Sequence, residues 1–222
     1  MRCMITFEQL NIESGLYQEI VNADTKKLSE SLSVGLVNYD MYSDMLGFIP
    51  HRRLFDLAMV PLWRGSDGFR NELVILSDSI LAEWEISSED ELLDMACGFA
   101  PDSSGVVFME LKQFCEMMMP DNPCEGDGIT YMLTNRYLDY GASALCYDGI
   151  MKYISKSLGH GFYVIPANVH HMFIIPDYVS RIDVELHSRC VNDVNSLTLS
   201  SGEYLSNKIY YYDKDTEELV MA

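Results

Sequence analysis

The residues best suited to chemistry lie in the second half of the chain, where His170 and His171 follow Asn168. Imidazole groups can transfer protons near neutral pH and can ligate metals. Asn135 is another polar residue at the end of a predicted strand, and loop residues on a rigid scaffold often form binding sites. We therefore consider Asn135, Asn168 and His170 as candidate binding residues. The alternative is that both asparagines only form turns, which their side chains favour.

The sequence predicts no metal site and no cofactor. Neighbouring residues on a strand point to opposite faces, so His170 and His171 would not bind one ion, and no H-x-H or H-x-x-x-H spacing occurs. The six cysteines include no C-x-x-C pair, so neither a zinc site nor a disulfide framework is expected. The glycine-rich motifs that bind phosphates are absent from the sequence.

Catalysis by a serine or cysteine nucleophile has little support. No G-x-S-x-G motif is present, and Cys146 lies in an apolar run, where surroundings disfavour the reactive thiolate. A hydrolase-like enzyme would instead use His170 with Asn135 or Asp148, in a site between two lobes. No catalytic residue is assigned from the sequence.

Three residues are predicted to cap the N-termini of helices in the fold that would position the candidate binding residues. Asp78 and Asp148 each follow a short apolar run and precede apolar residues at helical spacing. Counted from each aspartate, apolar residues occur at −4, −3, −2, +2, +3 and +6, which indicates a repeated strand–Asp–helix unit. Any strand followed by a capped helix gives the same offsets, so the repeat has a simpler alternative. Ser88 and Glu91 form a capping box that begins a further helix.

Hydrophobic periodicity predicts an α+β fold with mixed, mainly antiparallel sheets. Strands are expected at 34–39, 55–63, 73–76, 129–133, 142–147, 162–165, 172–175, 209–212 and 219–220. Helices are expected at 14–32, from Ser88 to Gly98, at 107–118, at 148–158 and from Ser180 onward. Pro61 should place the end of its strand at a sheet edge or at a bulge, because proline cannot donate to a ladder.

The length of 222 residues allows one continuous domain or two closely packed lobes. The expected N-terminal lobe, 1–119, contains a helix, a hairpin and two or three further helices. The expected C-terminal lobe, 128–222, contains hairpins and helices, and the polar loop 120–127 would connect the two. No run of eighteen apolar residues and no signal-peptide pattern is present, so we expect a cytoplasmic protein.

The charge is strongly negative, with 34 acidic against 15 basic residues and a formal net charge of −19. Such a surface repels nucleic-acid phosphates and anionic membranes, so neither is expected as a direct partner. It suits a basic protein partner, although the charge could serve solubility alone. We expect a non-catalytic protein-interaction module. The alternatives are the hydrolase-like enzyme and an acidic nucleic-acid mimic that inhibits a DNA-binding protein.

Several short motifs occur in a distinctive order: Val37-Asn38-Tyr39, Ile49-Pro50-His51-Arg52-Arg53, Leu76-Ser77-Asp78, Met132-Leu133-Thr134-Asn135, Tyr163-Val164-Ile165-Pro166 and Tyr211-Tyr212-Asp213. In these motifs the chain resembles a bacterial family known from gut clostridia, the domain-of-unknown-function family 5688. The resemblance runs from about residue 37 to the C-terminus. It implies a cytoplasmic α+β protein without an established activity, and it supplies no catalytic residues. It also implies a longer segment before Asn38 and a glutamate in place of His171.

Overall fold

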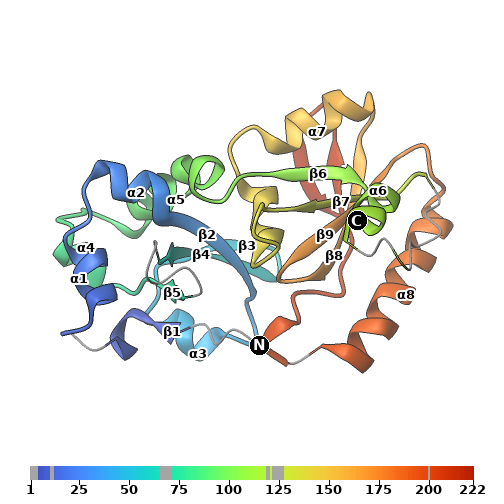
Figure 1. Cartoon of the computed structure of the whole chain (residues 1–222). Coiled ribbons are helices and arrows are strands. Elements are labelled where there is room, and N and C mark those ends of the chain that lie inside the picture. Colours follow the sequence, from blue (N-terminus) through green and yellow to red (C-terminus); the bar gives the residue numbers. More distant parts are fainter. Residues whose placement is uncertain (1–4, 11–12, 66–71, 119–120, 122–127, 200) are drawn as a thin grey trace. The chain divides into compact units, whose positions relative to one another are not determined.

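A computed structural model describes residues 5–10, 13–65, 72–118, 121, 128–199 and 201–222. The chain divides into two compact units, Met1–Gly105 and Val106–Ala222. Helices and mainly antiparallel sheets occur in both, which confirms the predicted α+β class (Figure 1). Among the described helices, none has the length and apolar character that crossing a bilayer needs.

The sheet of the first unit is built around β4 (Leu57–Arg64), whose residues are all buried. β4 pairs antiparallel with β2 (Leu32–Asn38) along one edge, and with β3 (Arg52–Leu54) and β5 (Leu73–Ile75) along the other. The short β1 (Ile5–Thr6) adds to β5 in parallel and forms an edge of the sheet. The predicted strands at 34–39, 55–63 and 73–76 are therefore confirmed, and 73–76 is an inner strand as its apolar run indicated.

Pro61 lies neither at a sheet edge nor at a bulge, since its pairing with β2 keeps an uninterrupted register, so that prediction is wrong. Its carbonyl oxygen accepts a hydrogen bond from Leu76, so its nitrogen faces the same side of β4. On that side, β3 pairs with β4 up to Met59 and β5 pairs from Leu62 onward. Pro61 lies between the two partner strands, where the missing N–H interrupts neither ladder.

The helices of the first unit differ from the prediction in two places. The expected helix at 14–32 is two helices, α1 (Gly15–Val21) and α2 (Thr25–Ser31), because Asp24 caps α2 by accepting a hydrogen bond from the Lys27 N–H at 2.8 Å. The remaining short helices are η1 (Phe7–Gln9), α3 (Ser43–Leu46) and α4 (Ser79–Glu83).

The second difference is α5 (Glu89–Ser103), which continues past Gly98 and through Pro101. Its inner face buries apolar residues on both sides of Gly98 and packs against β2 and β4, and this burial outweighs the weak helix preference of glycine and proline. The helix ends where Gly105 takes a left-handed conformation, with φ at +66°. The Ser103 hydroxyl donates to the Leu32 carbonyl at 2.7 Å and attaches the end of α5 to β2.

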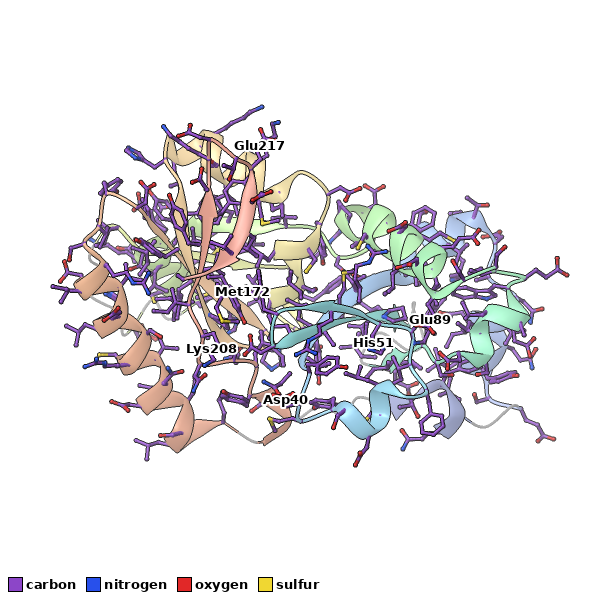
Figure 2. The ribbon with its side chains drawn as sticks, turned by 180° about the vertical axis from the view of Figure 1, so that it is seen from behind. Asp40, His51, Glu89, Met172, Lys208 and Glu217 are labelled. Atoms are coloured by element: carbon purple, nitrogen blue, oxygen red, sulfur yellow. The ribbon has the colours of Figure 1, made fainter. Side chains whose placement is uncertain are left out.

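The second unit has a six-stranded antiparallel sheet in the order β11-β10-β8-β9-β7-β6. Its strands are β6 (Val107–Glu110), β7 (Tyr131–Thr134), β8 (Phe162–Asn168), β9 (His171–Pro176), β10 (Tyr210–Asp213) and β11 (Glu218–Met221). Its helices are α6 (Leu111–Met118), η2 (Gly141–Cys146), α7 (Ile150–Leu158), α8 (Arg181–Thr198) and η3 (Ser201–Glu203). Figure 2 shows Glu217 at the tip of the β10–β11 hairpin, where it pairs with Lys152 of α7 at 2.5 Å.

Two further predictions in the second unit are wrong. Residues 107–118 form β6 followed by α6 rather than one helix, because the first four residues pair with β7. Residues 142–147 form most of the 3₁₀ helix η2 rather than a strand, so the strand–Asp–helix unit is not repeated. The side chains from Ala142 to Leu145 are all buried, and an apolar run does not distinguish a buried strand from a buried 3₁₀ turn.

The division between the units falls at Gly105, since β6 already belongs to the sheet of the second unit. The loop expected to connect two lobes, 120–127, lies outside the described residues apart from Asp121. Among the cysteines, Cys97, Cys146 and Cys190 are free thiols, whereas Cys115 on α6 is disulfide-bonded. The sequence predicted no disulfide framework, and Cys115 is the described cysteine that departs from a fully reduced chain.

Candidate functional site

The three candidate residues lie together at one end of the sheet of the second unit. Asn135 directly follows β7, Asn168 ends β8, and His170 lies in the turn between β8 and β9. Because β9 pairs with both β7 and β8, the C-terminal end of β7 lies beside the β8–β9 turn. The Thr134 hydroxyl donates to the His170 carbonyl oxygen at 2.7 Å and joins the two segments.

Both asparagine side chains are used inside their own turns. Asn135 Oδ1 accepts hydrogen bonds from the backbone N–H groups of Tyr137 and Asp139, at 3.0 and 3.3 Å. Asn168 Oδ1 accepts a hydrogen bond from the His170 N–H at 2.8 Å. These are turns in which an Asn side chain replaces a backbone acceptor. The asparagines therefore fix the two loops that carry His170 and its neighbours.

The imidazole ring of His170 lies between two carboxylates. Its Nδ1 atom is 3.4 Å from Oδ1 of Asp139, and its Nε2 atom is 3.7 Å from Oε1 of Glu203. The side chain of His170 is 23% exposed, so solvent reaches the site. The two carboxylates face opposite ring nitrogens and do not converge on one point. Within the described parts of the chain, no group of three or more His, Cys, Asp or Glu side chains could hold a metal ion.

The hydrogen bond at Nδ1 of His170 does not match the arrangement around a hydrolase base. Its Nδ1 atom accepts a hydrogen bond from the backbone N–H of Tyr140 at 3.2 Å, so the neutral ring carries its hydrogen on Nε2. A base oriented by a carboxylate needs the reverse, with Nδ1–H donating and Nε2 bare. The carboxylates beside His170 are those of Asp139 and Glu203; Asp148, the partner suggested by the sequence, is exposed in the turn before α7.

Gly141 allows the β7 end and the β8–β9 turn to approach each other. A Cβ atom on Gly141 would lie 2.5 Å from the Asn135 nitrogen and 2.8 Å from the His170 carbonyl oxygen, and closer still to Thr134 Oγ1. Only glycine fits between these groups. The sequence contained this signal as a single glycine in the predicted loop just before the run Ala142–Cys146, but nothing in the spacing showed which segments it separates.

The predicted cap at Ser88 has the expected geometry. Its hydroxyl accepts a hydrogen bond from the Glu91 N–H at 3.2 Å. The return bond differs from a standard capping box, since Glu91 Oε2 accepts from the N–H of Ser87 at 3.0 Å. Ser88 therefore positions α5, whose first turn carries three acidic residues at the positive end of the helix dipole.

The two predicted aspartate caps need correction. Asp78 holds the N-cap position of α4, but its backbone is already helical, with φ −56° and ψ −29°, and its side chain makes no capping hydrogen bond. Asp148 precedes the N-cap of α7, which is Gly149 with φ +74°. Both aspartates lie close to a helix start, as expected, but neither side chain caps the helix.

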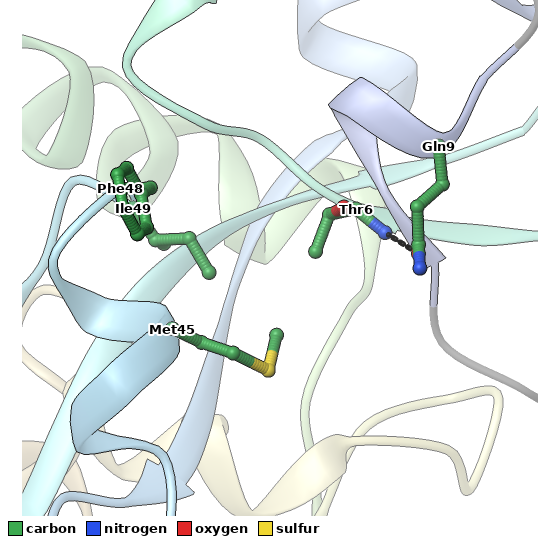
Figure 3. Close-up of a pocket in the computed structure, with 5 residues that line it drawn as sticks. All are labelled: Thr6, Gln9, Met45, Phe48 and Ile49. Atoms are coloured by element: carbon green, nitrogen blue, oxygen red, sulfur yellow. Dashed lines mark hydrogen bonds between the residues drawn. The ribbon is translucent and has the colours of Figure 1, made fainter.

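A hollow in the first unit was not foreseen from the sequence. It has a volume of about 340 Å³ and is lined by Thr6, Gln9, Met45, Phe48 and Ile49. Figure 3 shows the side chains of Met45 and Ile49 pointing toward Thr6. The Thr6 N–H donates to Gln9 Oε1 at 2.8 Å and shapes the opposite wall. We name this feature the Phe48 hollow.

The side chains around the Phe48 hollow are unusually exposed for apolar residues. Phe48 is 71% exposed, Met41 50% and Met45 37%, whereas Ile49 is 4% exposed and belongs to the core. Met41, Met45 and Phe48 have the sequence spacing i, i+4, i+7, although of the three only Met45 lies within α3. This spacing was the available signal, but Leu46 and Ile49 hid it because they are apolar and lie on the buried side.

The charge near the hollow is negative. Asp40 and Asp44 are exposed on the segment that carries Met41 and Met45, and Figure 2 marks Asp40 beside α3. The basic residues that follow are engaged within the unit. Arg52 contacts Asp90 and Asp94, both at 2.9 Å, and the Arg53 guanidinium lies 4.1 Å from the centre of the Tyr39 ring.

Comparison with known proteins places the chain in one family. The model of DUF5688, described as a family of unknown function, matches residues 9–214. No curated protein and no solved structure matches the chain. The family match begins before α1, earlier than the residue 37 from which the resemblance was expected, and extends through β10. The chain therefore belongs to the DUF5688 family.

Proposed function

We propose that this protein is an interaction module that binds a basic segment of another protein, with an apolar anchor of that segment in the Phe48 hollow. The observation that carries the proposal is the 71% exposure of the Phe48 side chain. An aromatic ring so exposed adds little to the stability of a fold, and aromatic residues are enriched at the centres of protein interfaces.

The size and lining of the hollow suit a side chain rather than a large ligand. A volume of about 340 Å³ lies at the lower end of the range for small-molecule pockets, which begins at roughly 300 Å³. Met45, Phe48 and Ile49 supply apolar surface on one side. Methionine adapts its shape to different partners, which favours binding of a leucine or aromatic anchor.

The charge around the hollow supports a basic partner. Asp40 and Asp44 are exposed on the same segment, whereas Arg52 and Arg53 are held by contacts within the unit. With the formal net charge of −19, this arrangement attracts a cationic segment at long range and repels an anionic one. The affinity should therefore fall as salt concentration rises.

The proposal is tested by capturing partners from a lysate of the native organism with the full chain and with Phe48→Asp. We expect at least one protein that the wild-type chain retains and Phe48→Asp loses. Tyr153→Asp is the matched control, because Tyr153 is 59% exposed on α7 of the second unit. Titration calorimetry with the purified partner should then show an affinity at least tenfold weaker for Phe48→Asp, and weaker binding of the wild type in high salt.

Two results would contradict the proposal. One is a partner that Phe48→Asp binds as tightly as the wild type does. The other is an equal loss of binding in Phe48→Asp and Tyr153→Asp, which would show a general effect of added negative charge. Circular dichroism of both variants verifies that they are folded.

A further inference from the structure

The two faces of α8 differ in what covers them. On one face, Val184 is fully buried in a cluster with Ile165 of β8 and Ile175 of β9. Ser188, one turn further along that face, is 5% exposed. These contacts hold α8 against the sheet of the second unit.

The opposite face of α8 carries a continuous apolar row. Its members are Ile182, Leu186, Cys190, Val194 and Leu197, at successive spacings of four, four, four and three residues. Ile182 is 78% exposed, Leu186 and Val194 are each 58% exposed, and Leu197 is 87% exposed. Cys190, at the middle of the row, is an exposed free thiol. Apolar rows of this length on a surface helix usually contact a partner. We name it the α8 row.

The α8 row is nearly symmetric about Cys190. Leu186 and Val194 lie four residues before and after it, and Ile182 and Leu197 lie eight before and seven after. Two polar residues beside the row are placed with the same symmetry. The histidine His187 lies three residues before Cys190, and the aspartate Asp193 lies three residues after it. An antiparallel second α8, related by a two-fold axis through Cys190, would therefore meet an equivalent surface.

We infer that the α8 row is an interface between two copies of this chain, related by a two-fold axis near Cys190. Across this axis, Leu186 of one copy packs against Val194 of the other, and the contact occurs twice. His187 of one copy faces Asp193 of the other, also twice. Such self-complementarity is what an isologous interface requires, and two-fold dimers are the commonest oligomers.

Helix geometry is compatible with this contact. Rows of residues four apart form the ridges that interlock when two helices cross at about −50°, with their axes roughly 8–10 Å apart. The central members of the α8 row then make the contact, and Ile182 and Leu197 lie at its rim. Because Cys190 lies at the crossing point, the two Cys190 side chains face each other across the axis.

The area and the charge together predict a weak, salt-dependent dimer. One helix face provides a small interface, in the class of transient contacts below about 1,200 Å². The formal charge of −19 on each copy opposes association at low salt. Added salt screens this repulsion, so dimerisation should strengthen with salt. This dependence is opposite to that of binding to a basic partner, so the inference stands apart from the proposed function.

Sedimentation velocity of the full chain over a range of concentrations and salt tests the inference. We expect a dimer that increases with both, and a dissociation constant at least tenfold weaker for Leu186→Asp and for Val194→Asp. The control is again Tyr153→Asp, which adds the same charge to an exposed site on α7. Both α8 substitutions are at exposed positions, and circular dichroism verifies their folding.

Chemical cross-linking locates the axis independently. A short bis-maleimide linker should join two wild-type chains through Cys190, and Cys190→Ser should remove that product. In the Cys190→Ser background, Tyr153→Cys should not restore it, because Tyr153 lies away from the proposed axis.

Three outcomes would overturn the inference. The chain could remain monomeric at high concentration in high salt, or the dimer could persist in both α8 variants. Alternatively, the chain could stay monomeric but sediment with anionic phospholipid vesicles in a manner that depends on Leu186, which would make the α8 row a membrane-contact surface.

Discussion

The ring centroids of His170 and His171 lie 5.9 Å apart, yet the two rings have different surroundings. His170 faces the carboxylates of Asp139 and Glu203. The Nδ1 atom of His171 is buried and has no hydrogen-bond partner in the described part of the protein. Burial, with a smaller contribution from the nearby charge of His170, lowers the pKa of His171 to about 4. His171 is therefore neutral in the folded protein at pH values where a histidine in the unfolded chain is protonated.

The buried His171 predicts a loss of stability in mild acid. Its ordinary pKa of 6.5 applies to the unfolded chain, and the folded value is about 4. Between these values the unfolded state binds the extra proton, so the free energy of unfolding falls as pH decreases from 6.5 toward 4 and is unaffected by His171 above 6.5. The full shift corresponds to at most about 3 kcal/mol. Urea unfolding across this pH range measures the loss.

His171→Gln isolates this effect because glutamine does not titrate. We expect its unfolding free energy to depend less steeply on pH than that of the wild type over the same range. His170→Gln should lessen the dependence without abolishing it, because it removes only the smaller contribution of His170 to the His171 shift and leaves the burial. An unchanged slope in His171→Gln would show that other groups cause the acid sensitivity.

The close packing around Gly141 predicts that even a substitution by alanine lowers the free energy of unfolding strongly. The added methyl group of Gly141→Ala would overlap the Asn135 nitrogen and the His170 carbonyl oxygen, both backbone atoms that cannot move independently. Overpacking of this kind costs typically about 1–3 kcal/mol, and loss of the Thr134–His170 hydrogen bond would add to it. We expect the free energy of unfolding to decrease by about 3 kcal/mol in urea titrations.

Gly98→Ala is the matched control for this prediction. Gly98 lies inside α5, and a Cβ atom there would meet nothing within 4 Å. Since alanine favours a helix over glycine, the substitution should raise the free energy of unfolding by about 1 kcal/mol. A Gly141→Ala variant as stable as Gly98→Ala would mean that the packing around Gly141 is looser than the structure shows.

Local chemistry predicted most elements of the fold. The hairpin of β8 and β9, the helix after Ser180 and the last two strands have the expected positions, because turn residues bound each apolar run. The failures occurred where long-range contacts decide the structure. Residues 107–110 could join a helix, but pairing with β7 makes them a strand, and burial of its inner face carries α5 past Gly98.

The candidate site was predicted in its location but not in its contacts. Asn135, Asn168 and His170 were selected as polar residues at strand ends, and strand pairing brings them together. Asp139 and Glu203 were not foreseen as neighbours of His170. Asp139 lies between Leu138 and Tyr140, whose positive φ values of +55° and +51° no motif encodes. Glu203 is brought to the site by a long-range contact, since its carbonyl oxygen accepts a hydrogen bond from the Val169 N–H at 3.0 Å. The Phe48 hollow was not foreseen, because it brings β1 and η1 beside α3 and the residues that follow α3, and these segments are far apart in the sequence.

Ser88 and Asp148 were both predicted from the sequence to cap a helix, but in the structure only the Ser88 side chain does so. Substituting each by alanine tests this difference. Ser88→Ala removes a hydrogen bond to the Glu91 N–H and should lower the free energy of unfolding by about 1 kcal/mol. Asp148→Ala removes an exposed side chain one residue before the N-cap of α7, so it should change stability by less than about 0.5 kcal/mol. Thermal and urea unfolding measure both. If Asp148→Ala cost as much as Ser88→Ala, the aspartate would act as the cap that the sequence suggested.

Phe48 and Ile49 are adjacent, but the structure predicts opposite consequences for their loss. Ile49 is 4% exposed, so Ile49→Ala should leave a cavity and lower the free energy of unfolding by about 3 kcal/mol. Phe48 is 71% exposed, so Phe48→Ala should change it by less than about 0.5 kcal/mol. Urea unfolding of the two variants measures the contrast. A large loss in Phe48→Ala would mean that the ring packs into the fold, and the case for a partner at the Phe48 hollow would then be lost. If the free energy of unfolding of Phe48→Ala equals that of the wild type, the exposed aromatic ring serves binding rather than folding.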